Sequence, residues 1–353
     1  MYPRIAFFFK DFSLYLIVDL IAVLVFISSV FFLVKSKYAL NVKKITIAVI
    51  FSLVSTALIF SIFEGYFRYI YDESDGLGFL QVNKRWQERH VVYNNFFKRD
   101  RDFKVEKSAG TVRVGVLGDS ITFGAGIADP KDRFSDILQK DFRQNGINAE
   151  IYNLGVPGLD SHEEIKLYQD LSYLNFDIIV WQYFLNDIQP EDKGGPAKII
   201  SQDAYSSDLM SVLNKNSTFF DFLYWRFSSK YATTFDQLGS HYLQMYSDES
   251  ILKSHEEELS KFIGELKEKD KKIVVIIFPF IELIGPDYPA NYVHDEMKSF
   301  FNSHDIEVVD LLSDLKDSNW KKLVASKFDT HPNEKVHKLA AEKLYEKLYP
   351  ELK

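Results

Sequence analysis

The sequence predicts an α/β protein with a doubly wound, parallel, five-stranded sheet, preceded by a hairpin of two transmembrane helices. Three observations support this prediction. From about residue 111 onward, short apolar runs alternate with amphipathic helical segments. The apolar runs are continuous, which is typical of strands in a sheet that helices cover on both faces. Before residue 70 the chain consists largely of two long apolar runs.

Length, charge and composition limit the possible functions. The chain of 353 residues is long enough for one substantial domain and additional segments. Its formal net charge is -8 and its pI is about 5.6, and no basic block is present, so we expect no nucleic-acid partner. The chain contains no cysteine, which excludes thiol catalysis, thiolate metal sites and disulfides.

The two N-terminal apolar runs are predicted to span a membrane over about residues 13–34 and 45–65. A spanning helix needs ~20 apolar residues, and both runs reach that length. Neither run has the amphipathic periodicity of a helix packed on a soluble core. A cleavable signal peptide is disfavoured because Lys35 and Lys37 follow the first run where a cleavage site would need small residues. Asp19, inside the first span, is either functional or a carboxylate hydrogen-bonded to a neighbour, and the second interpretation is favoured.

Basic residues give the orientation of this hairpin. The connector over residues 35–44 contains four lysines and no acid, whereas the N-terminal flank offers only Arg4 and Lys10. Positively charged loops favour the cytoplasm, so residues 35–44 are predicted to be cytoplasmic. The sequence therefore predicts a two-span protein of the cell membrane, with everything after about residue 71 on the extracytoplasmic side.

The remaining chain divides into a connector and one large domain. Residues 71–110 are rich in aromatic and charged residues, and the α/β pattern occupies residues 111–353. Residues 190–249 interrupt this pattern with an aromatic cluster, which could form a lid, pack on the membrane surface or enlarge the core; its helical spacing favours core packing. The predicted strands cover residues 112–117, 150–154, 177–183, 273–278 and 306–311, and the predicted helices cover 132–144, 162–174 and 334–348.

The first predicted strand ends in Gly118-Asp119-Ser120. A strand ending in this way places a serine hydroxyl on a tight turn that leads into a helix, where unpaired N–H groups can face a developing negative charge. A simple strand-to-turn boundary would also use Asp119 and Ser120, as turn and cap residues. The wider pattern favours a site, because ligands bind beyond the carboxyl ends of parallel strands and Gly155 and Asn186 also follow strands.

Four blocks in this order resemble the SGNH, or GDSL-type, hydrolase superfamily: Gly118-Asp119-Ser120, Asn153-Leu154-Gly155, Leu185-Asn186-Asp187 and Asp329-Thr330-His331. The resemblance covers about residue 111 to the C-terminus. It implies a flavodoxin-like fold, a serine ester hydrolase or O-acetyltransferase activity, and no cofactor. It also implies an oxyanion hole formed by the backbone N–H groups of Ser120 and Gly155 and the side-chain amide of Asn186.

Ser120, His331 and Asp329 are the predicted catalytic residues. A serine hydroxyl is a weak nucleophile unless an adjacent base removes its proton. His331 precedes the terminal helix, at the same rim of the sheet as Ser120, and is the candidate base. The alternative interpretation is an ordinary loop histidine before a helix, with Pro332 and Asn333 as helix start signals. Asp329 would accept the other imidazole N–H and fix the tautomer.

Two positions depart from the family pattern. Phe184 stands where the asparagine block usually opens with glycine. The histidine block usually has its aspartate three residues before the histidine, but Phe328 is there and Asp329 is two before, a spacing shared with membrane-associated relatives that acetylate exopolysaccharides. Asp310, at the end of the last predicted strand, is therefore an alternative partner for the histidine. No metal site is expected, because the other histidines considered lack ligand spacing: His162, His294, His304 and His337.

These features predict a membrane-tethered esterase or O-acyltransferase that moves an acyl group, with acetyl favoured, through an ester on Ser120. The acyl group would pass to water or to a sugar hydroxyl, and the same residues serve both outcomes. An extracytoplasmic glycan is the expected substrate from location alone. A lipid ester is the alternative substrate, and a non-catalytic envelope scaffold that retains the fold is the alternative class. An envelope protein or an acyl-donor membrane protein is the expected partner.

Overall fold

The computed structural model describes residues 4–76, 78, 80–188, 208–227 and 239–353. The chain forms two compact units, and it passes between them more than once. One unit contains Met1–Asp72, Leu80–Arg85 and Tyr205–Ser228, and the other contains Glu73–Phe79, Trp86–Ala204 and Ser229–Lys353.

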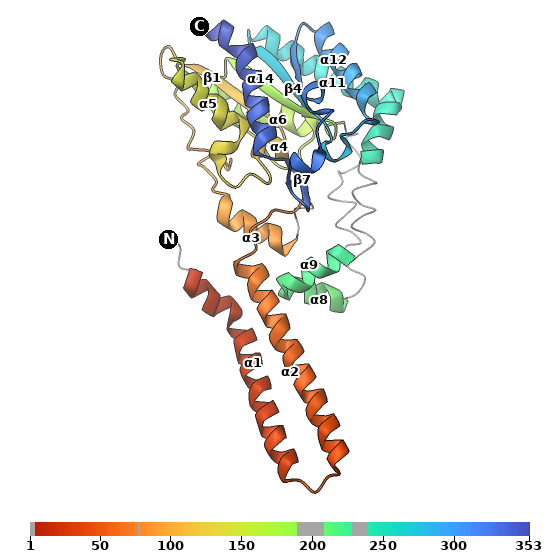
Figure 1. Cartoon of the computed structure of the whole chain (residues 1–353). Coiled ribbons are helices and arrows are strands. Elements are labelled where there is room, and N and C mark those ends of the chain that lie inside the picture. Colours follow the sequence, from red (N-terminus) through yellow and green to blue (C-terminus); the bar gives the residue numbers. More distant parts are fainter. Residues whose placement is uncertain (1–3, 77, 79, 189–207, 228–238) are drawn as a thin grey trace. The chain divides into compact units, whose positions relative to one another are not determined.

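The second unit is built on a five-stranded parallel sheet, which confirms the predicted fold class (Figure 1). Its strand order is β2-β1-β3-β4-β5, so the order reverses direction at β1 and β3, which are neighbours. In such sheets the crevice at this switch point is where ligands bind. The observed bounds lie within one residue of those predicted: β1 (Val112–Leu117), β2 (Ala149–Asn153), β3 (Ile178–Phe184), β4 (Lys272–Phe278) and β5 (Glu307–Asp310).

Helices cover both faces of this sheet, as its continuous apolar strands require. On one face Phe134 of α5 (Phe134–Gln144) packs on Phe278 of β4, and α14 (Glu334–Leu352) packs beside α5. On the other face Trp181 of β3 contacts Phe262 of α11 (Glu249–Glu268) and Phe301 of α12 (Asn291–Ser303). This face also carries α6 (Ser161–Leu171), whose Glu164 accepts a hydrogen bond from the indole of Trp181.

Short elements at the carboxyl edge hold the predicted site residues. The one-turn helix α4 (Ser120–Phe123) follows β1 directly. Near the C-terminus, β6 (Val324–Ser326) and β7 (Asp329–Pro332) form a small antiparallel hairpin, with α13 (Leu312–Leu315) before it and α14 after it. The segment around His331 was expected to be a loop and is a strand. It pairs with β6, with Val324 opposite Pro332 and Ser326 opposite Asp329.

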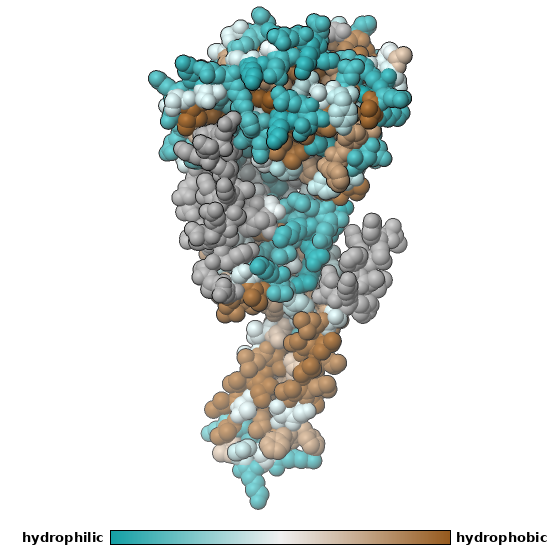
Figure 2. All heavy atoms as spheres, turned by 180° about the vertical axis from the view of Figure 1, so that it is seen from behind, coloured by the Kyte–Doolittle hydropathy of each residue, from teal (hydrophilic) through white to brown (hydrophobic). Residues whose placement is uncertain are grey.

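The first unit contains the two long N-terminal helices, α1 (Arg4–Lys35) and α2 (Leu40–Tyr69), which pack on each other. Apolar side chains are exposed along both helices, and Figure 2 shows the resulting hydrophobic surface. Both helices are long and apolar enough to cross a membrane. Asp19 accepts a hydrogen bond from Ser61 at 3.0 Å, as expected for a carboxylate that is hydrogen-bonded to a neighbour.

The described parts of the 190–249 insertion divide between the two units: residues 239–249 belong to the second unit, where the Tyr246 hydroxyl is 2.6 Å from that of Tyr183 in β3, and residues 208–227 belong to the first unit. Residues 208–227 contain α8 (Asp208–Asn216) and α9 (Thr218–Phe227), and α3 (Gln81–His90) lies between the two N-terminal helices and β1 in sequence. Phe219 of α9 stacks on Phe63 and Phe67 of α2. Glu64 of α2 is fully buried and accepts hydrogen bonds from the N-terminus of α9. Phe219 and Phe222 of the aromatic cluster therefore pack against α2.

Candidate active site

The turn that carries Ser120 depends on a glycine and on two neighbouring side chains. Gly118 has φ +157°, and a Cβ there would lie 2.2 Å from Thr122 Oγ1, so no larger residue fits. The buried Asp119 carboxylate caps α4 by accepting from the Ile121 N–H at 2.9 Å. Gln182 Oε1, from the adjacent strand β3, accepts from the N–H groups of Asp119 and Thr122. These bonds fix Ser120 as the first residue of a short helix.

Ser120, His331 and Asp329 lie in a continuous hydrogen-bonded line. His331 Nε2 is 2.9 Å from Ser120 Oγ, across a separation of 211 residues in the chain. His331 Nδ1 is 2.5 Å from Asp329 Oδ1, and the His331 backbone N–H donates to the same oxygen at 3.1 Å. The structure thus brings the three predicted catalytic side chains together in the order that a nucleophile, a base and an orienting acid require.

The alternative carboxylate, Asp310, has different partners. Its Oδ1 is 2.8 Å from His294 Nδ1, and its Oδ2 is 3.2 Å from Lys298 Nζ. Of the two aspartates considered in the sequence, Asp329 is therefore the one beside His331.

The structure adds Ser74, which the sequence did not indicate. Ser74 Oγ donates to Asp329 Oδ2 at 2.5 Å, and both side chains are buried. The segment around it is bound to the β6–β7 hairpin, since the Ser326 hydroxyl donates to the Ser74 carbonyl and the Gly76 N–H donates to the Phe328 carbonyl. Ser74 lies 255 residues before Asp329, in a connector without periodicity, so no local pattern could have revealed it.

Comparison with known families agrees with this arrangement. The profile of the GDSL-like Lipase/Acylhydrolase family matches residues 116–339, a span that includes Ser120, Asp329 and His331. The chain belongs to this family. It is a serine ester hydrolase by this membership, and the predicted resemblance is confirmed.

Solved structures with similar folds come from several sources. A lipase/acylhydrolase from Enterococcus faecalis is 15% identical in sequence. Its match covers 69% of this chain and 97% of the acylhydrolase chain, with a TM-score of 0.42. A member of the lipolytic protein G-D-S-L family from Veillonella parvula is 16% identical, with coverages of 67% and 97% and a TM-score of 0.37. A two-domain esterase active on acetylated mannans is 12% identical, with coverages of 68% and 49% and a TM-score of 0.36. No curated protein matches the chain.

Two of the predicted oxyanion donors of this GDSL-like hydrolase, Gly155 and Asn186, differ in whether the donor already has a hydrogen-bond partner. The Gly155 N–H donates to Asn153 Oδ1 at 3.0 Å, and a Cβ at Gly155 would lie 2.2 Å from the Phe123 nitrogen. Gly155 is thus a close-packing position whose N–H is already engaged. Asn186 Nδ2 lies 3.5 Å from Asp119 Oδ2, beyond a good hydrogen bond.

Two backbone N–H groups, one after β1 and one in the loop after β2, have no hydrogen-bond partner in the described residues. They are the Ser120 N–H and the Gly158 N–H. Gly158 has φ +83°, and the space around its Cα is open. It lies three residues after the glycine that the sequence indicated. A short motif could not distinguish the two, because the engagement of Gly155 depends on how the Asn153 side chain folds back.

Charges around His331 favour its protonated form. Burial lowers the pKa of His331, but the charge and hydrogen bond of Asp329 more than offset this and raise it to about 8. Burial raises the pKa of Asp329, but the His331 charge and the hydrogen bonds from His331 and Ser74 hold it below its usual range. Burial raises the pKa of Asp119, and the hydrogen bond from the Ile121 N–H and the charge of His331 offset this only in part. The hydrolase therefore holds an ionised acid beside a base that titrates above neutrality.

Asp187 shapes the loop after β3. Its Oδ2 accepts from the Phe184 N–H at 2.9 Å, which closes the turn that carries Asn186. Phe184 itself, at the position where the family usually has glycine, packs edge-to-face on Phe280. Among the residues that the structure describes, no three His, Asp or Glu side chains are grouped to hold a metal ion.

Proposed function

We propose that this protein is a membrane-tethered serine esterase or O-acyltransferase that acts on an acyl ester, with acetyl as the acyl group, of an extracytoplasmic glycan. One observation carries the chemical part of the proposal: the hydrogen-bonded line from Ser120 Oγ through His331 to Asp329, with contacts of 2.9 and 2.5 Å. Such a line activates a serine hydroxyl that would otherwise be a weak nucleophile.

In the first half-reaction, Ser120 Oγ attacks the carbonyl carbon of the ester while His331 Nε2 takes the hydroxyl proton. Asp329 stabilises the imidazolium that forms. The tetrahedral intermediate collapses when His331 returns the proton to the departing sugar oxygen. The products are a sugar hydroxyl and an acyl ester on Ser120.

In the second half-reaction, His331 removes a proton from water or from another sugar hydroxyl, and that oxygen attacks the acyl ester. Collapse of the second intermediate returns the proton to Ser120 Oγ. Water as the acceptor gives hydrolysis, and a sugar as the acceptor gives transfer. The protein groups are the same in both, and only the access of the acceptor differs.

The oxyanion that forms in each half-reaction needs donors aimed at it, each typically contributing ~10²–10³ in kcat. We assign this role to the Ser120 N–H, to the Asn186 amide, which lies 3.5 Å from Asp119, and to the Gly158 N–H, because the Gly158 loop is joined to the turn by the hydrogen bond from the Val156 N–H to the Gly118 carbonyl. Gly155 would take part only if Asn153 released its N–H.

The tether and its orientation support the substrate class. α1 and α2 have the length and composition of membrane spans, and the connector between them carries lysines without acids. Positive connectors favour the cytoplasm, which places the hydrolase unit on the outer side. A hydroxyl-bearing glycan is the substrate class that we propose from that location.

A fluorophosphonate probe tests the proposal directly. The full chain in detergent should become labelled, and Ser120→Ala should not, while the two proteins melt at similar temperatures. Hydrolysis of p-nitrophenyl acetate should depend on Ser120 in the same way. A folded wild-type protein without any Ser120-dependent adduct would indicate a non-catalytic scaffold. Faster turnover of p-nitrophenyl palmitate than of the acetate would indicate a lipid ester.

A further inference from the structure

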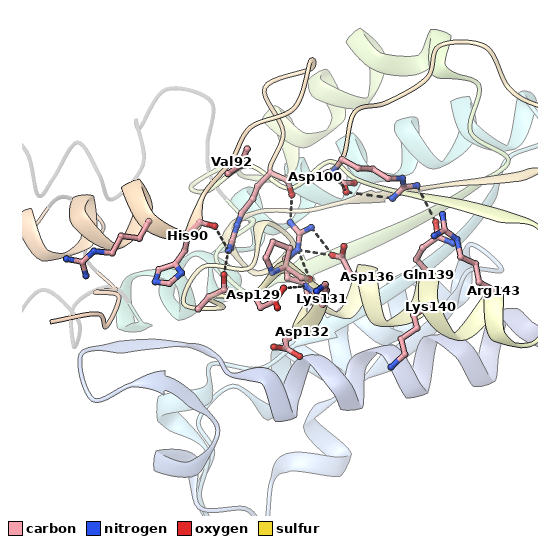
Figure 3. Close-up of a pocket in the computed structure, with 16 residues that line it drawn as sticks. His90, Val92, Asp100, Asp129, Lys131, Asp132, Asp136, Gln139, Lys140 and Arg143 are labelled. Atoms are coloured by element: carbon pink, nitrogen blue, oxygen red, sulfur yellow. Dashed lines mark hydrogen bonds and ion pairs between the residues drawn. The ribbon is translucent and has the colours of Figure 1, made fainter. Parts of the chain in front are cut away.

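A cleft of about 1050 Å³ lies in the second unit, and none of the three proposed catalytic residues lines it. Its walls come from three segments: residues 89–101, the turn over residues 128–133, and the exposed side of α5 (Figure 3). The family chemistry proposed above uses none of these residues. The cleft is therefore a separate feature that needs its own explanation.

The lining of this cleft is basic, although the whole chain is acidic. Seven lysine and arginine side chains line it against four aspartates, whereas the chain carries a formal charge of -8. Three of the aspartates already interact with groups of the protein. Asp136 forms an ion pair with Arg133, Asp129 caps a short turn, and Asp100 accepts a hydrogen bond from the backbone of β2. The net charge that faces the cleft is thus positive.

Several of the cations have no acid partner. Lys131, Lys140 and Arg143 are exposed, and none of them forms an ion pair within the described chain. Lys131 precedes α5, whose first residue is Phe134, and Lys140 and Arg143 lie about 9 Å and 13.5 Å along the helix axis from that residue at 1.5 Å per residue. The cations are therefore spread along the cleft and do not converge on one point. Spread charges suit a ligand that carries several anionic groups at intervals.

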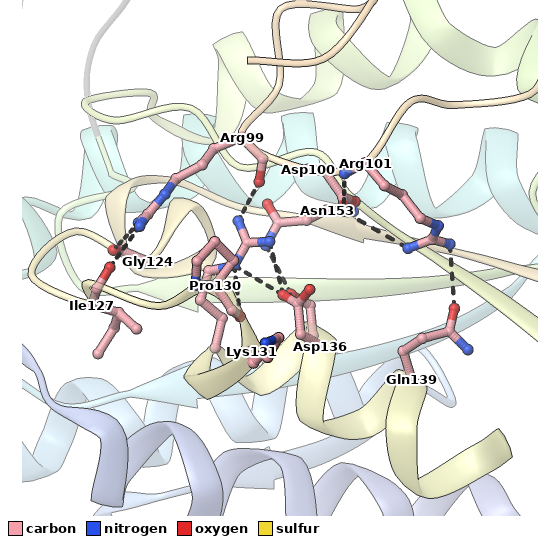
Figure 4. Close-up of polar contacts among 12 residues, drawn as sticks. Arg99, Asp100, Arg101, Gly124, Ile127, Pro130, Lys131, Asp136, Gln139 and Asn153 are labelled. Atoms are coloured by element: carbon pink, nitrogen blue, oxygen red, sulfur yellow. Dashed lines mark hydrogen bonds and ion pairs between the residues drawn. The ribbon is translucent and has the colours of Figure 1, made fainter. Parts of the chain in front are cut away.

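The floor of the cleft contains a buried cation. Arg99 is 1% exposed and forms no ion pair in the described residues. Its Nη atoms donate to the carbonyls of Gly124 and Ile127 at 2.7 and 2.6 Å (Figure 4), and its Nε has no partner. Burial and the nearby Arg133 lower the pKa of Arg99 to about 10, so it stays charged at neutral pH. A buried charge without a counter-charge is costly, and an anion in the cleft would offset that cost.

The same contacts connect the cleft to the nucleophile. Gly124 and Ile127 belong to the turn that follows α4, whose first residue is Ser120. Arg133 also reaches this turn, at 3.4 Å from the Phe123 carbonyl. A ligand on the cleft floor would therefore rest on residues that hold the nucleophile's turn in place.

We propose that this cleft binds an anionic polysaccharide, a glycan chain that carries carboxylate or phosphate groups, and holds it beside the Ser120 turn. This inference rests on the proposed function for the glycan and on the cleft for the charge. A nucleic acid is a poorer match, because single strands are bound through stacking on aromatic side chains and the lining residues include no Phe, Tyr or Trp.

Binding is measured with the full chain carrying Ser120→Ala, so that no turnover occurs. The probes are polygalacturonate for carboxylate, linear polyphosphate for phosphate, neutral dextran, and a single-stranded DNA oligonucleotide. We expect at least one of the first two to bind, with an affinity that falls as salt rises. Dextran should not bind, and DNA should bind more weakly. The two polyanions together distinguish which anionic group is preferred.

The matched variants locate the site. The triple change Lys131→Gln, Lys140→Gln and Arg143→Gln should weaken polyanion binding by about tenfold, with a shallower salt dependence. A control triple change of three exposed lysines outside the cleft removes the same charge and should alter binding less than about twofold: Lys253→Gln, Lys335→Gln and Lys338→Gln. Both triples should melt like the parent.

Four results would overturn the inference: no polyanion binding at low salt, equal losses in both triples, tighter binding of DNA, or equal affinity for neutral dextran. Each leaves the proposed function intact, because esterase activity on p-nitrophenyl acetate and fluorophosphonate labelling are measured separately on the Ser120 protein. Conversely, if neither esterase activity nor fluorophosphonate labelling were found, the polyanion-binding measurement would still be valid.

Discussion

Removing the Ser74 hydroxyl should impair catalysis without abolishing it. Ser74 Oγ donates to Asp329 Oδ2 at 2.5 Å, and the two residues are 3% and 1% exposed, so water cannot easily replace the bond. A hydrogen bond to a charged group contributes ~1.5–3 kcal/mol. If that energy aligns Asp329 for His331, Ser74→Ala should lower kcat/KM by about 10- to 100-fold. This is smaller than the ~10⁴-fold loss expected when the acid itself is disabled.

The pH profile separates a positioning role from a merely structural one. The Asp329 carboxylate would lose a donor in Ser74→Ala and attract the imidazolium more strongly. The pKa of His331, already raised to about 8, would rise further, and the acid limb of kcat/KM would move to higher pH. Ser74→Thr keeps the hydroxyl and should restore both the value of kcat/KM and the position of the acid limb of its pH profile. Unchanged kcat/KM and an unchanged limb in folded Ser74→Ala would refute the reasoning.

Three further predictions concern the base, its acid and the topology. Because the pKa of His331 is raised to about 8, its neutral form dominates only above that pH; kcat/KM for p-nitrophenyl acetate, followed over roughly pH 6–10, should rise with a midpoint near 8. Asp329→Ala should lower kcat by ~10³–10⁴, whereas Asp310→Ala should stay within about tenfold of wild type; the opposite order in steady-state kinetics would mean that Asp310 orients the base. Since the chain has no native cysteine, Lys43→Cys and Ser108→Cys are each a unique thiol. In intact cells an impermeant maleimide should label only Ser108→Cys, and labelling of Lys43→Cys alone would invert the topology.

The sheet was predictable because each of its strands can be identified from its own residues. β1 and β3 are largely apolar runs, and a polar residue follows each of them two positions later, Asp119 after β1 and Asn186 after β3, so both their positions and their parallel arrangement follow from the sequence. The association of Ser120 with His331 was predictable for the same reason, because parallel strands bring their carboxyl ends to one edge. The roles of the catalytic side chains in solution are still predictions.

Features that depend on distant partners were not predictable. Ser74 matters only through Asp329, and no pattern within the connector indicates that pairing. The buried Arg99 looks like any charged residue in a polar segment until the turn after Ser120 closes over it. The Gly155 N–H is a different case, because it donates to the Asn153 side chain only two residues away, and the residue types alone do not decide whether that local bond forms.

The carboxylate of Glu64 makes α2 and the insertion helix α9 dependent on each other. Its oxygens accept from the Ser217 hydroxyl at 2.6 Å and from the N–H groups of Thr218 and Phe219 at 2.9 Å, more than 150 residues along the chain. A tether taken from another protein would supply the hydrophobic length and lack this acceptor. The first turn of α9 would then keep buried donors without a partner. The two N-terminal helices are thus not interchangeable with those of another protein: substitutions in α2 and in α9 should be inherited together, as they are between the subunits of an obligate complex.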